Sequence, residues 1–270
     1  MIEGNLKNLL NQACNIAIKS GEIIEKYYKI KSNIVLKKDK SPLTQADLES
    51  NHYIINNLEK IDMTIPILSE ELTVEWSKRK NWEIYWLIDP LDGTKEFLKK
   101  NDEFTVNIAL IKKNKPILGV IFNPITKILY FALKNKGSYK CNIKEIKSSE
   151  NFFTNSIKLK TSVKKKDELV KVISSRSHPN EKLQQWLEKN FQKFKLIYQG
   201  SSMKFCLIAE GYADLYPRFK PTSEWDIAAG HLILTEAGGK IQSIDKNEIL
   251  YNSKESIINP HFIASCDLNI

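Results

Sequence analysis

The sequence predicts a layered fold of the α/β or α+β class, in which helices pack on mixed sheets. Three observations lead to this prediction. Helical periodicity lies near the N-terminus, strand-length apolar segments crowd the first half, and helix and strand signals alternate in the second half. The 270 residues are 42% hydrophobic, which is enough for a sizeable core. The longest apolar runs are far shorter than the roughly 20 residues that span a bilayer.

Two helices are predicted in the N-terminal part of the chain. Over residues 5–30 the leucine, isoleucine and alanine side chains return at helical spacing and form one apolar stripe. Thr44 followed by Asp47 resembles a capping arrangement. This arrangement predicts a second helix that begins there and ends near Glu59.

A sheet is predicted next. A short strand at 65–68 ends at an acidic pair, and the segment IYWLI at 84–88 is apolar throughout. Such a segment is typical of a strand buried on both faces. Three further strands are expected as a meander at 104–112, 116–122 and 127–133, joined by turns at KKNK and NPIT.

The second half predicts alternating elements after a join near residues 140–165. The glycine pair Gly238-Gly239 is expected to end the last helix. In chain order, the expected elements are a strand at 170–174, a helix at 180–190, a strand at 195–198, and helices at 202–210 and 224–237.

The charge distribution disfavours a nucleic-acid-binding protein. The net charge is +9, but the 41 basic residues include only three arginines and are scattered along the chain. Short basic runs at 77–80 and 164–166 are typical of solvated faces. By contrast, the stretch from Ser69 to Glu103 holds nine acidic and six basic residues, which suits cations. A non-catalytic basic protein that binds RNA or acidic lipid is kept as a remote alternative.

Cysteine usage and the N-terminus predict a cytoplasmic protein. The N-terminal residues lack the basic head and apolar stretch of a signal peptide. The four dispersed cysteines are expected to be small buried hydrophobes, and no closely spaced Cys/His set suggests zinc. They are Cys14, Cys141, Cys206 and Cys266.

The string DPLDGT after the predicted buried strand is the strongest functional signal. Asp89 and Asp92 leave the strand end together, and two buried carboxylates are costly unless cations compensate them. Magnesium is the hard cation that takes carboxylates and carbonyls, and Leu91 offers a backbone carbonyl here. The alternative is a capped turn, since Asp-Gly is a common turn dipeptide.

The residues that follow suit a phosphate. Gly93 lets the backbone approach a ligand closely, and Thr94 starts a short helix at 95–98 whose free N–H groups favour an anion. Asp226, in PTSEWDIAAG, falls in the first turn of a predicted helix. There it is either a further metal ligand or a carboxylate that only favours the helix dipole.

Several strings carry a family resemblance from about residue 5 to 265. They are ILSEE, WLIDPLDGTKEFLKKNDEFTVNIALI, SSRSH, GSSMKFCLIAEGYADLYPRFKPTSEWDIAAGH and EAGG. Together they resemble the inositol monophosphatase superfamily, and more closely its CysQ-type 3'(2'),5'-bisphosphate nucleotidases. The resemblance implies a layered αβαβα sandwich and a phosphomonoesterase that uses two or three Mg²⁺ ions.

The resemblance also implies roles for individual residues. Asp47 and Thr94 would orient the attacking water, and Gly93 and Thr94 would form the phosphate-binding turn. Glu71 would lie next to the metal ligand Glu70 without contacting the metal itself. The implied metal ligands are Glu70, Asp89, Leu91 through its carbonyl, Asp92 and Asp226.

The implied substrate is 3'-phosphoadenosine 5'-phosphate (PAP), cleaved to AMP and phosphate, with its sulfated precursor PAPS as a further candidate. Taken alone, His178 could cap a helix and Lys204 could be one more surface lysine. Inositol monophosphate or fructose 1,6-bisphosphate is the alternative substrate. The residues expected to bind substrate are Glu70, Leu91, Asp92, Gly93, Thr94, His178, Ser201, Ser202, Lys204, Arg218 and Asp226.

The expected organisation is one catalytic domain over 1–270, made of two packed halves. A metal-binding half would cover about 1–145 and a substrate-binding half 146–270. No nucleic-acid partner is expected. The alternatives of a monomer or a homodimer stay open, as does peripheral attachment to the cytoplasmic face of the inner membrane.

Overall fold

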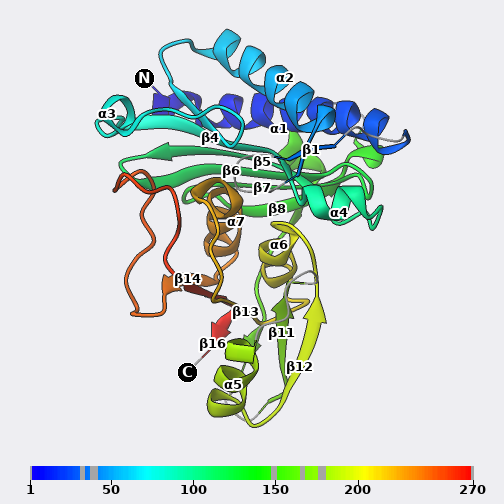
Figure 1. Cartoon of the computed structure of the whole chain (residues 1–270), viewed down its shortest axis with the longest axis vertical. Helices are drawn as coiled ribbons and strands as arrows, with labels where there is room; N and C mark the ends of the chain where they lie inside the picture. Colours follow the sequence, from blue (N-terminus) through cyan, green and yellow to red (C-terminus); the bar gives the residue numbers. More distant parts are fainter. Residues whose placement is uncertain are drawn as a thin grey trace.

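The computed structural model describes residues 2–30, 34–36, 42–146, 151–164, 168–175 and 181–268. Its elements stack as helices, sheet, helices, sheet and helix (Figure 1). Helices α1 (Ile2–Tyr28) and α2 (Gln45–Ile61) cover the outer face of a large sheet. The predicted αβαβα sandwich is confirmed.

The large sheet has seven strands. β3 and β4 are parallel, and every later pair in it is antiparallel. In spatial order the strands are β3 (Ile67–Ser69), β4 (Ile84–Asp92), β5 (Thr105–Lys112), β6 (Lys115–Asn123), β7 (Ile128–Leu133), β8 (Gly137–Asn142) and β9 (Ile157–Lys158).

The second sheet has five strands and lies beyond the middle helices, α6 (Met203–Ala209) and α7 (Glu224–Glu236). Helix α5 (Glu181–Asn190) covers its far side (Figure 1). Its strands are, in spatial order, β12 (Phe194–Tyr198), β11 (Val170–Ser174), β13 (Leu215–Arg218), β15 (Phe262–Ser265) and β14 (Lys240–Ser243).

Shorter elements complete the described chain. Helix α3 leads into β4, and α4 follows it. They are α3 (Trp76–Arg79), α4 (Thr94–Leu98), the antiparallel pair β1 (Ile34–Leu36) and β2 (Pro42–Thr44), the parallel pair β10 (Val163–Lys164) and β16 (Asp267–Leu268), and 3₁₀ turns at Ile143–Glu145 and Phe152–Asn155.

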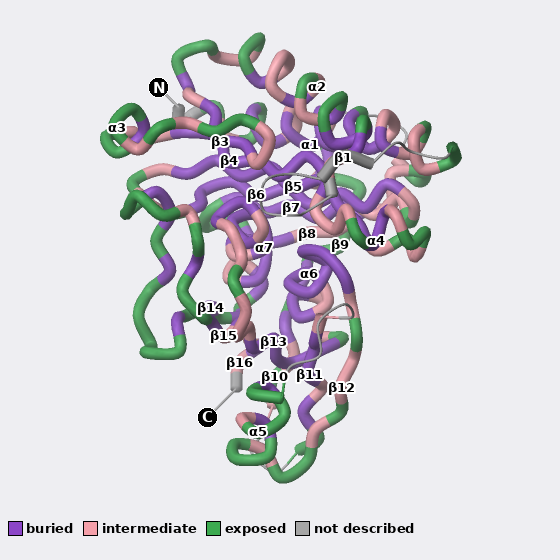
Figure 2. The backbone as a smooth tube through the Cα atoms, viewed as in Figure 1, coloured by how far each residue is buried: buried purple, intermediate pink, exposed green. Residues whose placement is uncertain are grey.

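Buried apolar side chains form three clusters, one under α1 and α2, one around α6 and α7 that reaches both sheets, and one under α5. The buried segments, purple in Figure 2, follow the sheets and the middle helices. Strand β4 shows how the large sheet serves two of them. Trp86 and Ile88 point into the cluster under α1 and α2, whereas Tyr85 and Leu87 point to the cluster around α6 and α7. The strand is therefore buried on both faces, as its unbroken apolar run predicts.

Helix α7 lies very close to the centre of the large sheet. A Cβ atom added at Gly119 of β6 would lie 2.7 Å from the carbonyl oxygen of Ala229 in α7. Only glycine permits this approach of helix backbone to strand backbone. The contact sets the height of α7 above the sheet, and α7 carries Asp226 in its first turn.

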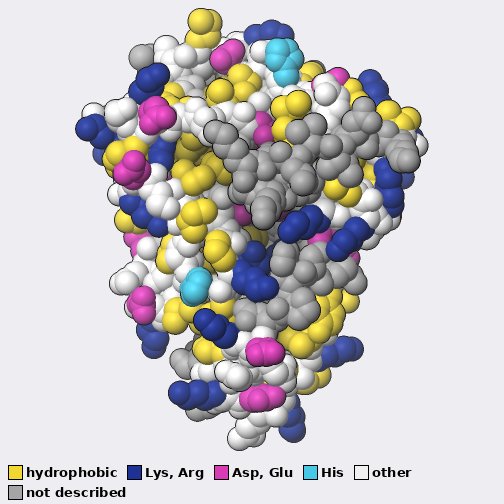
Figure 3. Space-filling model, viewed as in Figure 1, with side chains coloured by type: hydrophobic (Ala, Val, Ile, Leu, Met, Phe, Trp, Pro, Cys, Tyr) yellow, Lys and Arg dark blue, Asp and Glu magenta, His cyan; other side chains and the backbone are white. Residues whose placement is uncertain are grey.

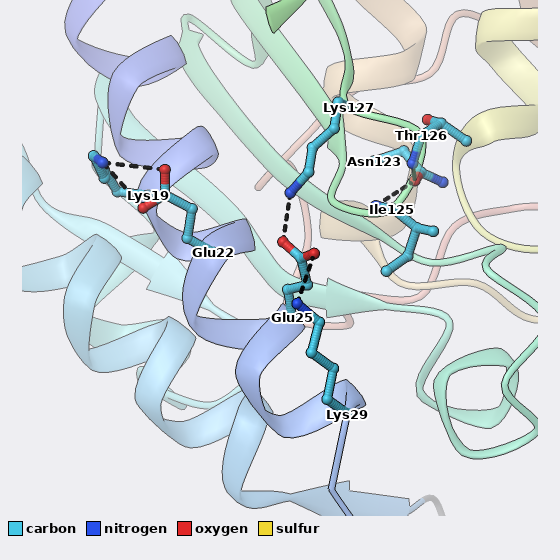
Figure 4. Close-up of polar contacts among 8 residues, drawn as sticks. All are labelled: Lys19, Glu22, Glu25, Lys29, Asn123, Ile125, Thr126 and Lys127. Atoms are coloured by element: carbon cyan, nitrogen blue, oxygen red, sulfur yellow. Dashed lines mark hydrogen bonds and ion pairs between the residues drawn. The ribbon is translucent and has the colours of Figure 1, made fainter. Parts of the chain in front are cut away.

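Polar contacts fasten α1 to the turn between β6 and β7 (Figure 4). Glu25 of α1 pairs with Lys127, whose ammonium lowers the pKa of that carboxyl. Asn123 closes the turn, because its Oδ1 accepts hydrogen bonds from the backbone N–H groups of Ile125 and Thr126. The turn expected at NPIT is thus present.

The structure differs from the predicted elements in several places. β4 does not end at Ile88 but continues through Pro90 to Asp92 with an irregular register. The strand at 65–68 lies at Ile67–Ser69. Strands β8, β13, β14 and β15 and helix α3 were not predicted. All four cysteines are buried and unpaired, as expected.

Candidate active site

The DPLDGT segment forms an irregular strand end. Pro90 has no N–H group to give to the ladder, and its carbonyl accepts a hydrogen bond of 2.8 Å from Ser50 Oγ of α2. Asp89 Oδ1 accepts a 3.1 Å bond from the Leu91 N–H group. Gly93 has φ of +94°, a left-handed conformation that favours glycine, and α4 begins at the next residue.

Three carboxylates from distant parts of the sequence converge beside this strand end. One oxygen from each of Glu70, Asp89 and Asp226 lies within 4.8 Å of the other two. Glu70 follows β3, and its N–H group donates to the carbonyl of Ile88 in β4. Asp226 is fixed in the first turn of α7, where its Oδ2 accepts a 2.8 Å bond from the Ser223 N–H group.

Asp92 lies next to this group without belonging to it. Its negative charge raises the pKa of both Asp89 and Asp226, so the four carboxylates act on one another. Asp92 Oδ2 is 3.5 Å from Nδ2 of Asn107, and the carboxylate also accepts a hydrogen bond from the backbone of Ser202.

The site suits divalent cations. Burial raises the pKa of Asp89 and of Asp226 well above the usual range, and the neighbouring carboxylates raise both further. Burial raises the pKa of Asp92 to about 6 against the pull of Lys204. Oxygen ligands crowded at this spacing are the donor set of Mg²⁺, and a cation would relieve their repulsion.

Glu71 does not join the acidic group. Its N–H group is 3.3 Å from Ser69 Oγ, which places it on the turn after β3. Among the described residues, the group of three is the one cluster whose geometry could hold a metal.

Asp47 and Thr94 stand together at the other side of the strand end. Thr94 Oγ1 is 3.2 Å from Asp47 Oδ1 and 3.3 Å from the Leu91 carbonyl oxygen. Asp47 Oδ2 accepts bonds of 2.7 and 2.6 Å from the N–H and hydroxyl groups of Thr44, in the predicted capping box. The Asp47 carboxylate is therefore held rigidly in the first turn of α2.

A cavity of about 140 Å³ opens next to the acidic group. Lys204 lies inside it, where burial lowers the pKa of its ammonium to about 8 and the Tyr216 ring lies 5.3 Å away. In the view of Figure 3, Lys and Arg side chains gather near the middle of the face that is drawn. The cavity is lined by Asp92, Gly93, Glu96, Ser175, Gly200, Ser201, Ser202, Lys204, Phe205, Tyr216, Arg218, Thr222, Asp226 and Ile227.

Most predicted substrate residues line this one cavity, including Ser201, Ser202, Lys204 and Arg218. Arg218 donates hydrogen bonds of 3.1 Å to the carbonyls of Lys220 and Pro221. His178 lies outside the described residues. The sequence reasoning missed four polar members of the lining, although the strings DGTKEF, SSRSH and YPRFKPT contain them. They are Glu96, Ser175, Tyr216 and Thr222.

Comparisons with known proteins agree on the family. A profile of the inositol monophosphatase family matches residues 5–266. The 3'(2'),5'-bisphosphate nucleotidase CysQ of Buchnera aphidicola is 44% identical over 263 residues, which cover 96% of this chain and 94% of that protein. The enzyme of the same name from Salmonella typhimurium is 39% identical over 258 residues, covering 94% and 98%.

Solved structures give the same result. The crystal structure of CysQ from Bacteroides thetaiotaomicron matches with a TM-score of 0.84 at 38% identity, covering 97% of this chain and 98% of that one. An inositol monophosphatase from Anabaena shares the fold, with a TM-score of 0.71 at 22% identity, covering 99% and 93%. This chain belongs to the inositol monophosphatase family.

Proposed function

We propose that this chain is a 3'(2'),5'-bisphosphate nucleotidase, which hydrolyses PAP to AMP and phosphate with Mg²⁺. The observation that carries the proposal is the position of a carboxylate cluster at the edge of a cavity that Lys204 and Arg218 help to line. The carboxylate cluster suits the metal ions that would bind the phosphate to be cleaved. The adjoining cavity suits the second phosphate of the substrate. Relatives at 39–44% identity over most of the chain carry the name of this enzyme.

The proposed metal ligands are Glu70, Asp89, Asp92, Asp226 and the carbonyl oxygen of Leu91. They would hold two or three Mg²⁺ ions. When bound, Mg²⁺ neutralises charge on the phosphate and lowers the pKa of water. The four carboxylates alone would repel a phosphate, and with cations held between them they would form a site that binds it.

Asp47 and Thr94 would position the attacking water. The Thr94 hydroxyl hydrogen is engaged by Asp47 and by the Leu91 carbonyl, so a lone pair of Oγ1 is free to accept a hydrogen bond. A water that donates this bond has its own lone pair turned to the phosphorus. Asp47 is then the carboxylate that takes up the proton through Thr94.

The cavity residues would bind the part of the substrate that is not cleaved. The Arg218 guanidinium, whose Nε and Nη2 already donate to backbone carbonyls, would offer its remaining N–H groups to a phosphate, and Lys204 would add a point charge. Ser201 would offer its hydroxyl on the turn before α6, and Ser202, whose own hydroxyl is bonded to β5, would shape the same wall. His178 is proposed to join them on the strength of the family resemblance alone.

A phosphate-release panel tests the function. Purified protein is assayed with PAP, PAPS, inositol 1-phosphate and fructose 1,6-bisphosphate, each with Mg²⁺ and with EDTA. We expect PAP to give the highest kcat/KM and EDTA to abolish turnover. Faster hydrolysis of inositol 1-phosphate would replace the proposal with the sister activity. If no compound is hydrolysed, a gel shift with RNA tests the non-catalytic alternative.

The cellular setting is also a proposal. Among the described helices, none has the length and apolar character needed to cross a bilayer. We place the enzyme in the cytoplasm, where its nucleotide substrate would be found. Whether it acts as a monomer or a homodimer is answered by light scattering.

A further inference from the structure

The turn between β12 and α6 has an unusual backbone. Ser201 has φ of +50°, in the left-handed region that residues other than glycine rarely adopt. Ser201 and Ser202 line the cavity, and Lys204 donates a hydrogen bond to the Ser201 carbonyl. A conformation of this kind persists only where surrounding contacts hold it. The contacts that hold residues 200–202 therefore decide the shape of the cavity wall.

Glu103, on the loop before β5, makes the first of these contacts. Its Oε2 accepts a 2.8 Å hydrogen bond from the Gly200 N–H group. Its carbonyl oxygen lies 2.9 Å from the position of a Cβ added at Gly200, and 3.0 Å from one added at Gly93. The two glycines thus both approach the carbonyl group of Glu103 closely. One belongs to the phosphate-binding turn and the other to the cavity wall.

Strand β5 makes the second contact. Thr105 Oγ1 is 2.8 Å from Ser202 Oγ, which in turn is 2.7 Å from Asn107 Oδ1. Thr105 pairs directly with Asp92 in the β4–β5 ladder. All three side chains of this network are buried, so each bond is shielded from water.

We propose that Glu103 and Thr105 are positioning residues, which hold the 200–202 turn against Asp92 and give the cavity its nucleotide-binding shape. Neither residue lines the cavity, so they act through Gly200 and Ser202. The inference rests on the proposed nucleotidase function and deepens it. The 200–202 turn is then the determinant by which the enzyme distinguishes a nucleotide bisphosphate from a small monoester.

The distinction follows from where the contacts lie. A small monoester such as β-glycerophosphate needs the metal site and the Gly93 turn, which Glu103→Ala leaves in place. PAP needs the cavity wall as well. Loss of one hydrogen bond to a charged acceptor, with release of the turn, is expected to raise KM for PAP about tenfold. The KM for β-glycerophosphate should change less than about twofold.

The experiment compares four variants of the full-length enzyme in Mg²⁺, with kcat and KM measured on both substrates. Glu103→Ala and Thr105→Val should raise KM for PAP selectively. Glu103→Gln should restore a KM near that of wild type, because its amide oxygen still accepts from Gly200. Asp102→Ala is the matched control. Asp102 is the neighbouring residue on the same loop, and it bonds the Tyr28 hydroxyl of α1 at 2.7 Å.

Each outcome decides the inference. A selective rise in KM for PAP with rescue by Gln supports it. Equal losses on both substrates, or an Asp102→Ala effect as large as that of Glu103→Ala, would overturn it as a general loosening of the loop. If Glu103→Ala does not fold, Thr105→Val carries the same comparison. A wild type that is inactive on PAP overturns the proposed function as well, whereas an unchanged KM in active variants overturns the inference alone.

Discussion

Four carboxylates with like charge are the dominant feature at the scale of single residues. Because Asp89 and Asp226 are crowded by their neighbours, each is costly to ionise without a cation. A protein that kept this arrangement for stability alone would be better served by amides. The free-energy cost of ionising these crowded carboxylates is therefore what a metal-binding site requires.

Asp92→Asn is expected to lower kcat/KM for PAP by at least about 100-fold, because the amide no longer neutralises a cation. The fold should persist. Burial raises the pKa of Asp92 to about 6, so the ionised carboxyl destabilises the metal-free wild-type fold at pH 7. The metal-free variant should therefore melt no lower than the wild type. Phosphate release and thermal melting in EDTA measure both effects. Near-normal turnover at saturating Mg²⁺ would refute the assignment.

Thr94→Val is expected to lower kcat by about 100-fold, since the isosteric methyl group neither contacts Asp47 nor accepts a bond from water. The Mg²⁺ concentration for half-maximal activity should hardly move. A metal titration of the residual activity makes this comparison, with Thr64→Val as a surface control that loses only its bond to Asp62. A large shift in metal dependence would place Thr94 among the ligands instead.

Lys204→Ala and Arg218→Ala should each reduce kcat/KM on PAP by about tenfold or more, because a charged hydrogen bond to the retained phosphate is lost. Losses on β-glycerophosphate should be much smaller. Lys220→Ala, which alters a neighbouring half-buried cation outside the cavity lining, serves as the control. Equal losses on both substrates would show that these residues do not bind a second phosphate.

At the scale of elements, helix α7 matters most because it brings Asp226 to the site. Gly119→Ala would place a methyl group 2.7 Å from the Ala229 carbonyl and push the helix away from β6. We expect a loss of about 1–3 kcal/mol in the free energy of unfolding. A higher Mg²⁺ requirement should accompany it. Urea denaturation and a metal titration test both effects. An unchanged free energy of unfolding would show that α7 can move away from β6 at no cost.

The element boundaries show what the sequence could and could not predict. The long helices and the β5–β7 meander follow from periodicity and turn residues. The prediction ended β4 at Ile88 because Pro90 usually stops a strand. The structure carries the strand on to Asp92, because Pro90 falls within the register irregularity between Asp89 and Asp92, where the ladder requires no N–H group from it. β8, β14 and β15 were missed because their short, mixed patterns become strands only through their partners in the sheets.

At the scale of the whole molecule, the site lies between segments that the sequence separates widely. The strings DPLDGT and PTSEWD could predict which carboxylates matter. The bonds between Glu103 and Gly200 and between Thr105 and Ser202 could not be predicted, because they join β5 and the loop before it in one half to a turn of the other. The proposed division into a metal-binding and a substrate-binding half is blurred here, since Asp226 of the second half stands beside Glu70 and Asp89.

The stabilisation of the protein by Mg²⁺ should grow with pH. The pKa values of Asp89, Asp92 and Asp226 are raised in the metal-free fold, so these groups hold protons at pH 5 that a cation must displace. As pH rises through about 6, metal-free stability is lost and metal affinity increases. At pH 7.5 saturating Mg²⁺ should raise the melting temperature by about 5 °C.

Thermal melts with Mg²⁺ and with EDTA from pH 5 to 7.5 measure this difference directly. His231 adds a pH dependence of its own to each series. Because burial lowers its pKa to about 3, its contribution to the stability of the fold increases as pH rises from 5. This contribution is the same with Mg²⁺ and with EDTA, so it cancels in the difference between the two melting temperatures. A shift of equal size at both ends of the pH range would contradict the assignment of these carboxylates as ligands.

The docking of α7 on the large sheet also bears on protein synthesis. A ribosome makes Glu70 and Asp89 long before it makes Asp226, and the sheet strand that receives α7 is complete well before the helix itself. Until that helix emerges and settles against Gly119, the nascent polypeptide lacks the third member of its acidic trio. The carboxylate cluster is consequently complete only after α7 has been made and has packed on β6.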